Sequence, residues 1–345
     1  ILDKCRGSLG GGAVGDALGY EVEFMSLSSI QKRFGEKGIS RFVLDKNGVA
    51  QFSDDTQMTL FTLEGLRNGV FSTNVGKPQE ILPHIEKAYL NWYRTQTELP
   101  HNLPESEYSK IPSLWSRRAP GMTCLASLES IDEGLPVMNN SKGCGGVMRV
   151  APIGIFSGLY PEKYSLEDAA LLAGLASEIT HKHIASTFSS ALLAIIVARC
   201  IRENKVDRSV FHSIVEDGVS MLLKIYRGYD KEFEEFSILI NKALSLGKGE
   251  TNEKEAIREL GEGWVGDEAI AIAIFSVMRH IDNFEDCIVC AVNHDGDSDS
   301  TGAVAGNIIG AILGYSGIPT YYLESLEIEP ILVTATDDLH SLISR

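Results

Sequence analysis

The sequence lacks a net positive charge and a long uninterrupted hydrophobic run. It contains 31 Lys and Arg against 47 Asp and Glu among 345 residues, which gives a formal net charge of −16 at pH 7. A strongly anionic surface repels phosphate backbones, so we expect no nucleic-acid partner. Asp, Arg, His or Gly interrupts each apolar stretch before it reaches the ~20 residues that cross a bilayer. We therefore expect no association with a membrane.

Cysteine is scarce as well, and its six residues show no spacing typical of a disulfide framework. A chain of this size builds a large core without covalent cross-links, so scattered cysteines indicate a reducing compartment. Cys287 and Cys290 match a CxxC pattern, but their segment is apolar and has no second pair, which predicts core residues on one helix. The first six residues have no signal-peptide pattern, and we expect a cytoplasmic protein.

Helical periodicity dominates the chain, and we expect a compact all-α bundle that forms one domain over residues 1–345. The exception is a short hairpin expected around residues 41–51. A polar segment with four prolines, residues 99–122, is expected to form a long loop. Apolar residues recur at helical spacing between capping residues in seven segments: 82–94, 166–178, 185–203, 208–226, 232–246, 254–260 and 268–281.

Two further segments carry glycine at every fourth residue, and residues four apart share one helix face. Each helical glycine costs about 1 kcal/mol relative to alanine, so such rows need a compensating reason, which close approach of two backbones supplies. We expect both helices to be central and packed on each other, which would bring Glu21 and Glu23 near residues 297–300. The glycines are Gly7, Gly11, Gly15 and Gly19, then Gly302, Gly306, Gly310 and Gly314.

The segment from His294 to Gly302 contains three carboxylates, three hydroxyls and two glycines without one apolar side chain. Hard divalent ions such as Mg²⁺, Mn²⁺ and Ca²⁺ take oxygen ligands of this kind. A solvated acidic turn is the alternative, since Asp, Ser and Gly are common in turns. The nearly uncharged run 301–314 follows directly, so the inner end of the segment cannot be fully solvated, and we favour a cation site.

A second acidic pair, Asp54 and Asp55, follows Ser53 and opens the apolar-periodic stretch 57–66. Ser53 or Asp54 alone could be a helix N-cap. Capping does not explain three polar residues in a row, and adjacent carboxylates repel each other. Although the helix dipole by itself favours anions at an N-terminus, two acidic helix starts in one chain suggest that both hold metal ions.

Three other motifs do not fit their surroundings. Residues 10–15 satisfy GxGxxG, but no strand precedes them, so we expect no dinucleotide site. Residues 295–299 resemble the start of an EF-hand loop, but Ser300 and Gly306 stand where that loop needs Gly and Glu. The run 180–183 contains two histidines, yet the oxygen-rich clusters indicate a hard ion that does not seek imidazole.

Four segments occur in a specific order: residues 15–24, 53–56 and 143–152, and the acidic segment around Asp297. With these segments the chain resembles the ADP-ribosylglycohydrolase family, which includes dinitrogenase reductase-activating glycohydrolases and ADP-ribosylarginine hydrolases. The match runs essentially from end to end, and the ordered set is far more specific than any one segment. The resemblance implies an orthogonal helical bundle with a dinuclear Mg²⁺ or Mn²⁺ centre at the bottom of an ADP-ribose cleft.

The resemblance also implies roles for individual residues. It places the metal ligands at Ser53, Asp54, Asp55, Asp297, Asp299 and Ser300. It places the ribose and phosphate contacts at Gly143, Cys144, Gly145, Gly146, Met148 and His181. Catalytic carboxylates are expected at Glu23, Asp55 and Asp299, and which of them acts as general acid or base stays open.

The implied reaction suits these residues, because cleavage at the anomeric carbon of ribose develops oxocarbenium character that metals and carboxylates stabilise. We expect a hydrolase that removes ADP-ribose from modified protein, above all from arginine. Its partners would be the ADP-ribosylated protein and an ADP-ribosylating enzyme or toxin. Alternatives are hydrolysis of O-linked ADP-ribose, hydrolysis of a free ADP-ribosyl compound, and a non-catalytic binding role.

Overall fold

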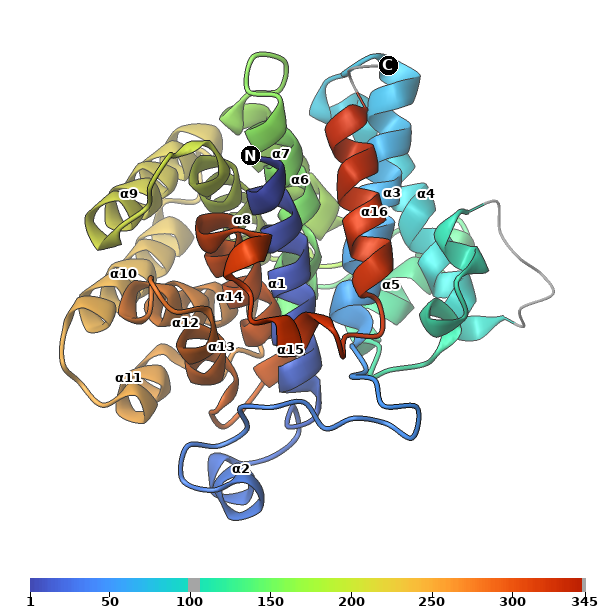
Figure 1. Cartoon of the computed structure of the whole chain (residues 1–345). Coiled ribbons are helices and arrows are strands. Elements are labelled where there is room, and N and C mark those ends of the chain that lie inside the picture. The colour runs from blue at the N-terminus through green and yellow to red at the C-terminus, as the bar shows by residue number, and fades with distance from the viewer. Residues whose placement is uncertain (99–105, 343–345) are drawn as a thin grey trace.

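The computed structural model describes residues 1–98 and 106–342, and the regular structure in these residues is helical (Figure 1). Strand-like pairing among them is limited to two isolated bridges, Ala50 with Leu326 and Gly143 with Val265. The prediction of an all-α fold is confirmed. The α-helices are α1 (Leu2–Tyr20), α2 (Leu27–Phe34), α3 (Asp54–Thr73), α4 (Pro78–Thr97), α5 (Met122–Asp132), α6 (Ala151–Leu159), α7 (Leu166–Glu178), α8 (Ile184–Arg202), α9 (Arg208–Ile225), α10 (Asp230–Lys248), α11 (Glu253–Leu260), α12 (Gly266–Arg279), α13 (Phe284–Val292), α14 (Ser298–Leu313), α15 (Thr320–Leu323) and α16 (Glu329–Ser341). The 3-10 helices are η2 (Tyr108–Lys110), η3 (Pro112–Trp115), η4 (Cys144–Arg149) and η5 (Tyr315–Gly317).

All seven segments predicted to be helical are helices, namely α4 and α7–α12, and most of their ends differ from the prediction by a few residues. Helix α7 has the predicted bounds, because the side chain of Ser165 accepts the N–H of Asp168 and fixes its start. Helix α4 is longer than predicted. It begins at Pro78, a first-turn position at which the missing N–H of proline costs nothing.

Two segments were predicted to be non-helical, a hairpin and a long loop. The prediction of a hairpin around residues 41–51 is wrong, because the backbone there pairs with a distant part of the chain. Ala50 donates its N–H to the carbonyl of Ser325 at 2.7 Å and accepts the N–H of Glu327 at 3.2 Å. Of the predicted loop 99–122, residues 99–105 lie outside the described residues, and the remainder contains η2 and η3 before α5 begins.

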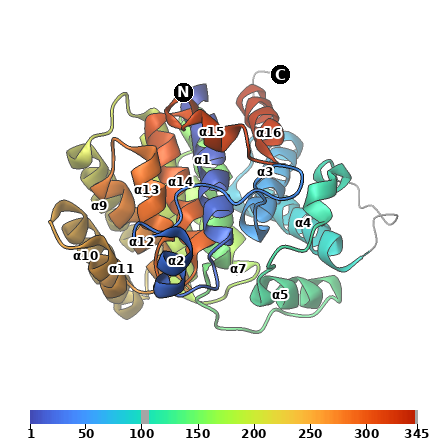
Figure 2. The same cartoon turned by 60° about the horizontal axis from the view of Figure 1, so that its bottom comes forward.

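Helices α1 and α14 lie side by side along their glycine rows, as predicted (Figure 2). A Cβ atom added at Gly7 would lie 2.3 Å from the carbonyl oxygen of Gly310. One added at Gly15 would lie 1.9 Å from the carbonyl oxygen of Gly302, so the two helices run antiparallel with their backbones in contact. The C-terminal end of α1 therefore meets the N-terminal end of α14.

Two groups of helices flank this central pair (Figure 1, Figure 2). Helices α3, α4 and α16 lie on one side, and α9–α13 lie on the other. Helix α8 contacts α6, α7, α9, α12 and α14. By length and apolar composition α8 could cross a membrane, and nearly all of its residues are buried against these neighbours. Cys287 and Cys290 are buried in α13, which confirms the prediction of core cysteines on one helix.

Candidate metal centre and active site

The ends of α1, α3 and α14 and the helix η4 surround one cavity of about 330 Å³. Most of the predicted site residues line it, namely Glu23, Asp54, Asp55, Gly143, Cys144, Gly145, Met148, His181, Asp297, Asp299 and Ser300. Ser53 and Gly146 are not among the lining residues. A larger hollow of about 620 Å³ shares only Trp264 with this cavity and contains none of the predicted site residues.

The first acidic pair lies at the start of α3, which Ser53 caps. The Ser53 hydroxyl accepts the N–H of Asp55 at 3.2 Å, so this hydroxyl caps helix α3 whether or not it also binds an ion. Asp54 accepts the N–H of Gly121 on its Oδ2 at 3.0 Å, which connects the start of α3 to the loop before α5. The Oδ2 atom of Asp55 is buried and has no hydrogen-bond partner among the described residues. Capping therefore does not account for Asp55.

The second acidic group lies at the start of α14. Asp297 is its N-cap and accepts the N–H of Ser300 at 3.2 Å. Ligand oxygens of Asp297, Asp299 and Glu23 all lie within 4.8 Å of one another. The glycine contact between α1 and α14 brings Glu23 here, as the sequence predicted. Glu21 instead points to Arg33 at 2.5 Å and takes no part in the cluster.

Five buried carboxylates share this space, and the described residues that line the cavity include no Lys or Arg. Burial and the charge of Asp299 raise the pKa of Glu23 to about 10. Burial also raises the pKa of Asp54, Asp55 and Asp297 well above the usual range. The Oε2 atom of Glu23 is buried and has no hydrogen-bond partner within residues 1–98 and 106–342. Divalent cations would compensate these charges, so the residues present fit a metal centre.

The glycine-rich segment forms one wall of the cavity. A Cβ atom on Gly143 or Gly145 would lie 2.9 or 2.8 Å from the ring of His181, so only glycine lets this ring pack there. Burial lowers the pKa of His181 to about 3, and its ring is therefore neutral. Gly146 faces away from the cavity, toward the hydroxyls of Ser177 and Ser186. Its role here is helix packing.

Two backbone donors of this wall are already used within the protein. The N–H of Gly143 donates to Ser141 Oγ, and the N–H of Cys144 donates to the carbonyl of Trp264, each at 3.2 Å. These two groups are thus not the free N–H donors that an anion needs. The thiol of Cys144 donates to Asp297 Oδ2 at 2.6 Å, and burial raises its pKa well above the usual value. Cys144 is a protonated wall residue.

Asp16 is a site residue that the sequence analysis did not identify. It is fully buried in α1, and its Oδ1 accepts the N–H of Ser53 at 2.9 Å. Its Oδ2 accepts the N–H of Thr56 at 3.0 Å and the Thr56 hydroxyl. Burial and the nearby Asp299 raise the pKa of Asp16 to about 7. Asp16 lies between Gly15 and Gly19 of the glycine row in α1, and its hydrogen bonds position the start of α3.

An aromatic pair at the cavity was also missed. Phe24 and Trp264 stack with ring centroids 6.1 Å apart, and both line the cavity. Phe24 is 76% exposed and Trp264 is 40% exposed, which is unusual for large apolar side chains and indicates a surface that a ligand could cover. In the sequence, Phe24 stands directly after Glu23, but nothing there indicates that it is exposed or that it pairs with Trp264.

Comparison with known proteins identifies the family. The model of the ADP-ribosylglycohydrolase family matches residues 1–345. ADP-ribosylarginine hydrolase Tri1 of Serratia proteamaculans is 26% identical over 330 residues, which cover 94% of this chain and 75% of that protein. The ADP-ribosyl-[dinitrogen reductase] glycohydrolase of Rhodospirillum rubrum is 24% identical over 345 residues, covering 95% and 92%. A solved structure of an ADP-ribosylglycohydrolase-related protein complex has the same fold, with a TM-score of 0.64 at 20% identity over 99% of this chain and 98% of that one. The chain belongs to the ADP-ribosylglycohydrolase family.

Proposed function

We propose that the protein is a metal-dependent hydrolase that removes ADP-ribose from ADP-ribosylated protein, with arginine as the linked residue. The observation that carries the proposal is the cluster of five buried carboxylates at the base of a glycine-walled cavity. Such a cluster is costly without cations. The name of the Serratia relative, an ADP-ribosylarginine hydrolase, supports arginine as the linkage.

The ions would be two Mg²⁺ or Mn²⁺ held by Asp54, Asp55, Asp297 and Asp299, with Ser300 beside them. All five residues line the cavity and offer the oxygen ligands that these ions prefer. Ser53 lies behind this wall, and we assign it to capping first. When bound, the ions would supply charge for orienting ribose hydroxyls and a water molecule.

Proton transfer requires a carboxylate with an oxygen that is not already hydrogen-bonded within the protein. Glu23 Oε2 and Asp55 Oδ2 have no hydrogen-bond partner in the part of the chain that the structure describes, and both residues line the cavity. Asp299, in contrast, accepts the N–H of Ser300 on its Oδ1 at 3.0 Å. Of the three expected catalytic residues, Glu23 and Asp55 are thus the better placed to exchange a proton with water or substrate.

The substrate side of the cavity would hold the ADP-ribose. The flat faces of Phe24 and Trp264 offer a stacking surface of the kind that planar bases use. His181 is neutral and buried, so it would shape the cavity without adding charge. Met148 contributes an apolar contact from η4.

The wild-type protein is expected to release free ADP-ribose from an arginine-ADP-ribosylated protein in Mg²⁺ and to stop when EDTA is added. Mass spectrometry of the released nucleotide would measure the rate. Serine-linked ADP-ribosyl protein and O-acetyl-ADP-ribose, assayed at the same concentrations, would test the O-linked and free-compound alternatives. Restoring Mg²⁺ after EDTA is the control for irreversible damage.

Each outcome favours one function. Faster release from the serine conjugate would replace arginine by an O-linked substrate. Release that continues in EDTA would contradict the metal centre. Absence of release from every conjugate, by protein that still binds ADP-ribose in calorimetry, would replace the hydrolase by a binding function.

Asp16→Asn is expected to raise the Mg²⁺ concentration for half-maximal activity by about tenfold, the effect typical of residues that hold metal ligands in place. The amide keeps one acceptor oxygen and turns an NH₂ group toward a backbone N–H, so the start of α3 loses its anchor. Asp3→Asn is the matched control. Asp3 lies at the far end of α1 and likewise accepts the N–H and hydroxyl of one residue, Ser316, at 3.1 and 2.9 Å. Equal Mg²⁺ requirements in the two variants would contradict the positioning role.

A further inference from the structure

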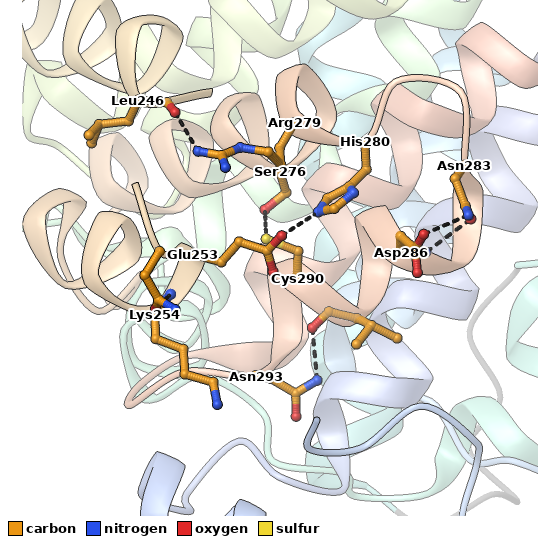
Figure 3. Close-up of polar contacts among 12 residues, drawn as sticks. Leu246, Glu253, Lys254, Ser276, Arg279, His280, Asn283, Asp286, Cys290 and Asn293 are labelled. Carbon is orange, nitrogen blue, oxygen red and sulfur yellow. Dashed lines mark hydrogen bonds and ion pairs between the residues drawn. The ribbon is translucent and has the colours of Figure 1, made fainter. Parts of the chain in front are cut away.

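We propose that Glu253, His280 and Cys290 form a second metal site, for a transition-metal ion of the Zn²⁺ class, separate from the carboxylate centre (Figure 3). The three residues come from three elements. Glu253 is the first residue of α11, His280 follows the last residue of α12, and Cys290 lies within α13. Their ligand atoms all lie within 4.8 Å of one another.

The kind of ligand distinguishes this site from the carboxylate centre. Thiolate and imidazole are ligands that Zn²⁺ and related ions prefer and that Mg²⁺ does not. One Cys, one His and one carboxylate leave a fourth position for water in a tetrahedral site. With bonds of about 2.3 Å to sulfur and about 2.0 Å to nitrogen or oxygen, tetrahedral ligand atoms lie about 3.3–3.6 Å apart. Binding would require these ligand atoms, which lie within 4.8 Å of one another, to move closer together.

The Glu253 carboxylate interacts with both of the other proposed ligands, His280 and Cys290. It accepts a hydrogen bond from His280 Nε2 at 2.8 Å, which requires the proton on that nitrogen. It also interacts with the Cys290 thiol. On metal binding the thiol releases its proton to solvent, and the imidazole carries its proton on Nδ1 instead. The thiolate and the carboxylate then bring two negative charges, which balance one divalent ion.

The surroundings hold these ligands in place and leave a path for an ion. The hydroxyl of Ser276 donates to the carbonyl of Ile272 at 2.9 Å and lies 3.6 Å from Cys290 Sγ, so it packs beside the sulfur. The neighbouring Arg279 donates to the carbonyl of Leu246 at 2.7 Å (Figure 3), and its charge adds to the hydrogen bond from His280 in lowering the pKa of Glu253. The side chains of His280 and Glu253 are 20% and 43% exposed, so the site opens to solvent on one side.

An ion here would join α11 and α12 to α13. The C-terminal end of α13 leads directly into the segment that carries Asp297. The site would therefore stabilise the part of the chain that holds the second acidic group, without contacting the substrate. Loss of the ion is expected to lower thermal stability and to leave the reaction chemistry intact.

Co²⁺ is the probe that tests the proposal, because a thiolate ligand gives Co²⁺ an intense charge-transfer band in the near ultraviolet. Metal-free protein would be titrated with Co²⁺ in excess Mg²⁺, which keeps the carboxylate centre filled. We expect the band to saturate at one equivalent of Co²⁺. Cys290→Ser should abolish it, and Zn²⁺ should displace Co²⁺ from the wild type. His280→Gln should weaken Co²⁺ binding on the order of 100-fold or more.

Two cysteine variants are the matched controls. Cys287→Ser removes the thiol one helical turn earlier in α13, and Cys144→Ser removes the thiol beside Asp297. Both are expected to keep the band. A wild type without the band, or a band that persists in Cys290→Ser or disappears in Cys144→Ser, would overturn the proposal. His280→Gln, at a partly exposed position, provides the same test if Cys290→Ser does not fold.

Measuring the release of ADP-ribose by the Cys290→Ser variant tests this metal site separately from the proposed hydrolase function. Cys290→Ser is expected to hydrolyse the arginine conjugate in Mg²⁺ at a rate within about twofold of the wild type at a temperature where both are folded. Failure of the hydrolase assay alone would leave the cobalt band as the deciding result for this site.

Discussion

Asp55→Asn is expected to lose most ADP-ribose release and, in the absence of metal, to melt at a higher temperature than the wild type. The higher melting temperature follows from the crowding of buried carboxylates. Burial raises the pKa of Asp55 well above its usual range, and Asp299 and Asp16 add to the effect. A raised pKa means that the folded state disfavours the ionised carboxylate, so a neutral amide of the same shape removes that penalty.

Metal reverses the order of stability. An ion that binds the folded state stabilises it by about 2.7 kcal/mol at 100 times its Kd. Asp55→Asn removes one ligand oxygen with charge, so its gain from Mg²⁺ should be much smaller than that of the wild type. Loss of a ligand and proton acceptor is expected to lower the rate on the order of 100- to 10,000-fold.

Thermal unfolding of both proteins in EDTA and in Mg²⁺, with the ADP-ribose assay run in parallel, measures all of these effects. Glu64→Gln is the matched control, since Glu64 is also a buried carboxylate of α3 but binds Ser106 and the N–H of Glu107 away from the cavity. Glu64→Gln should be stabilised by Mg²⁺ as much as the wild type is. An Asp55→Asn variant with the Mg²⁺ gain and rate of the wild type would exclude Asp55 from the metal centre.

Gly15→Ala is expected to be the most destabilising single-methyl change in α1. Its Cβ would lie 1.9 Å from the carbonyl oxygen of Gly302, a backbone atom that no rotamer change can move. The helices must separate, and overpacking of this kind costs about 1–3 kcal/mol, occasionally more. The gain in helix propensity returns about 1 kcal/mol at most. We expect a net loss of about 2 kcal/mol and reduced activity, because the same contact holds Glu23 near Asp297.

Gly10→Ala is the control on the same helix. The nearest atoms to a Cβ at this position belong to the ring of Tyr315 at 3.4 Å, which is ordinary contact. Stability should stay within about 1 kcal/mol of the wild type and rise rather than fall. Urea unfolding followed by circular dichroism compares the two variants. Equal urea midpoints for the two variants would mean that the close contact of α1 with α14 does not require glycine at position 15.

Local patterns in the sequence carry much of this architecture. The glycine rows predicted the contact between α1 and α14 because a spacing of four residues defines one helix face. The acidic groups at the starts of α3 and α14 were recognisable because Asp pairs beside apolar runs are unusual. The hairpin prediction failed because strand signals do not reveal that Ala50 pairs with residues near the other end of the chain.

Residues whose role depends on a distant partner were not predictable in this way. The position of Asp16 in the sequence, between two glycines of a helix, suggests only a residue near a packing interface. Its three hydrogen bonds are made to residues at the start of α3, and the sequence does not show that α1 and α3 meet there. Cys290 was correctly expected in the core. Its neighbours Glu253 and His280 lie at the ends of two other helices, α11 and α12. Periodicity predicts the buried face of a helix without predicting which helices meet there.

The antiparallel contact of α1 with α14 has a consequence for biosynthesis. One acidic group follows α1 early in the chain, and the other opens a helix near its end. A nascent chain that still lacks α14 can form α3 but cannot complete the cluster, and α1 has no second glycine row to pack against. The proposed metal binding would therefore be among the last properties to emerge during synthesis.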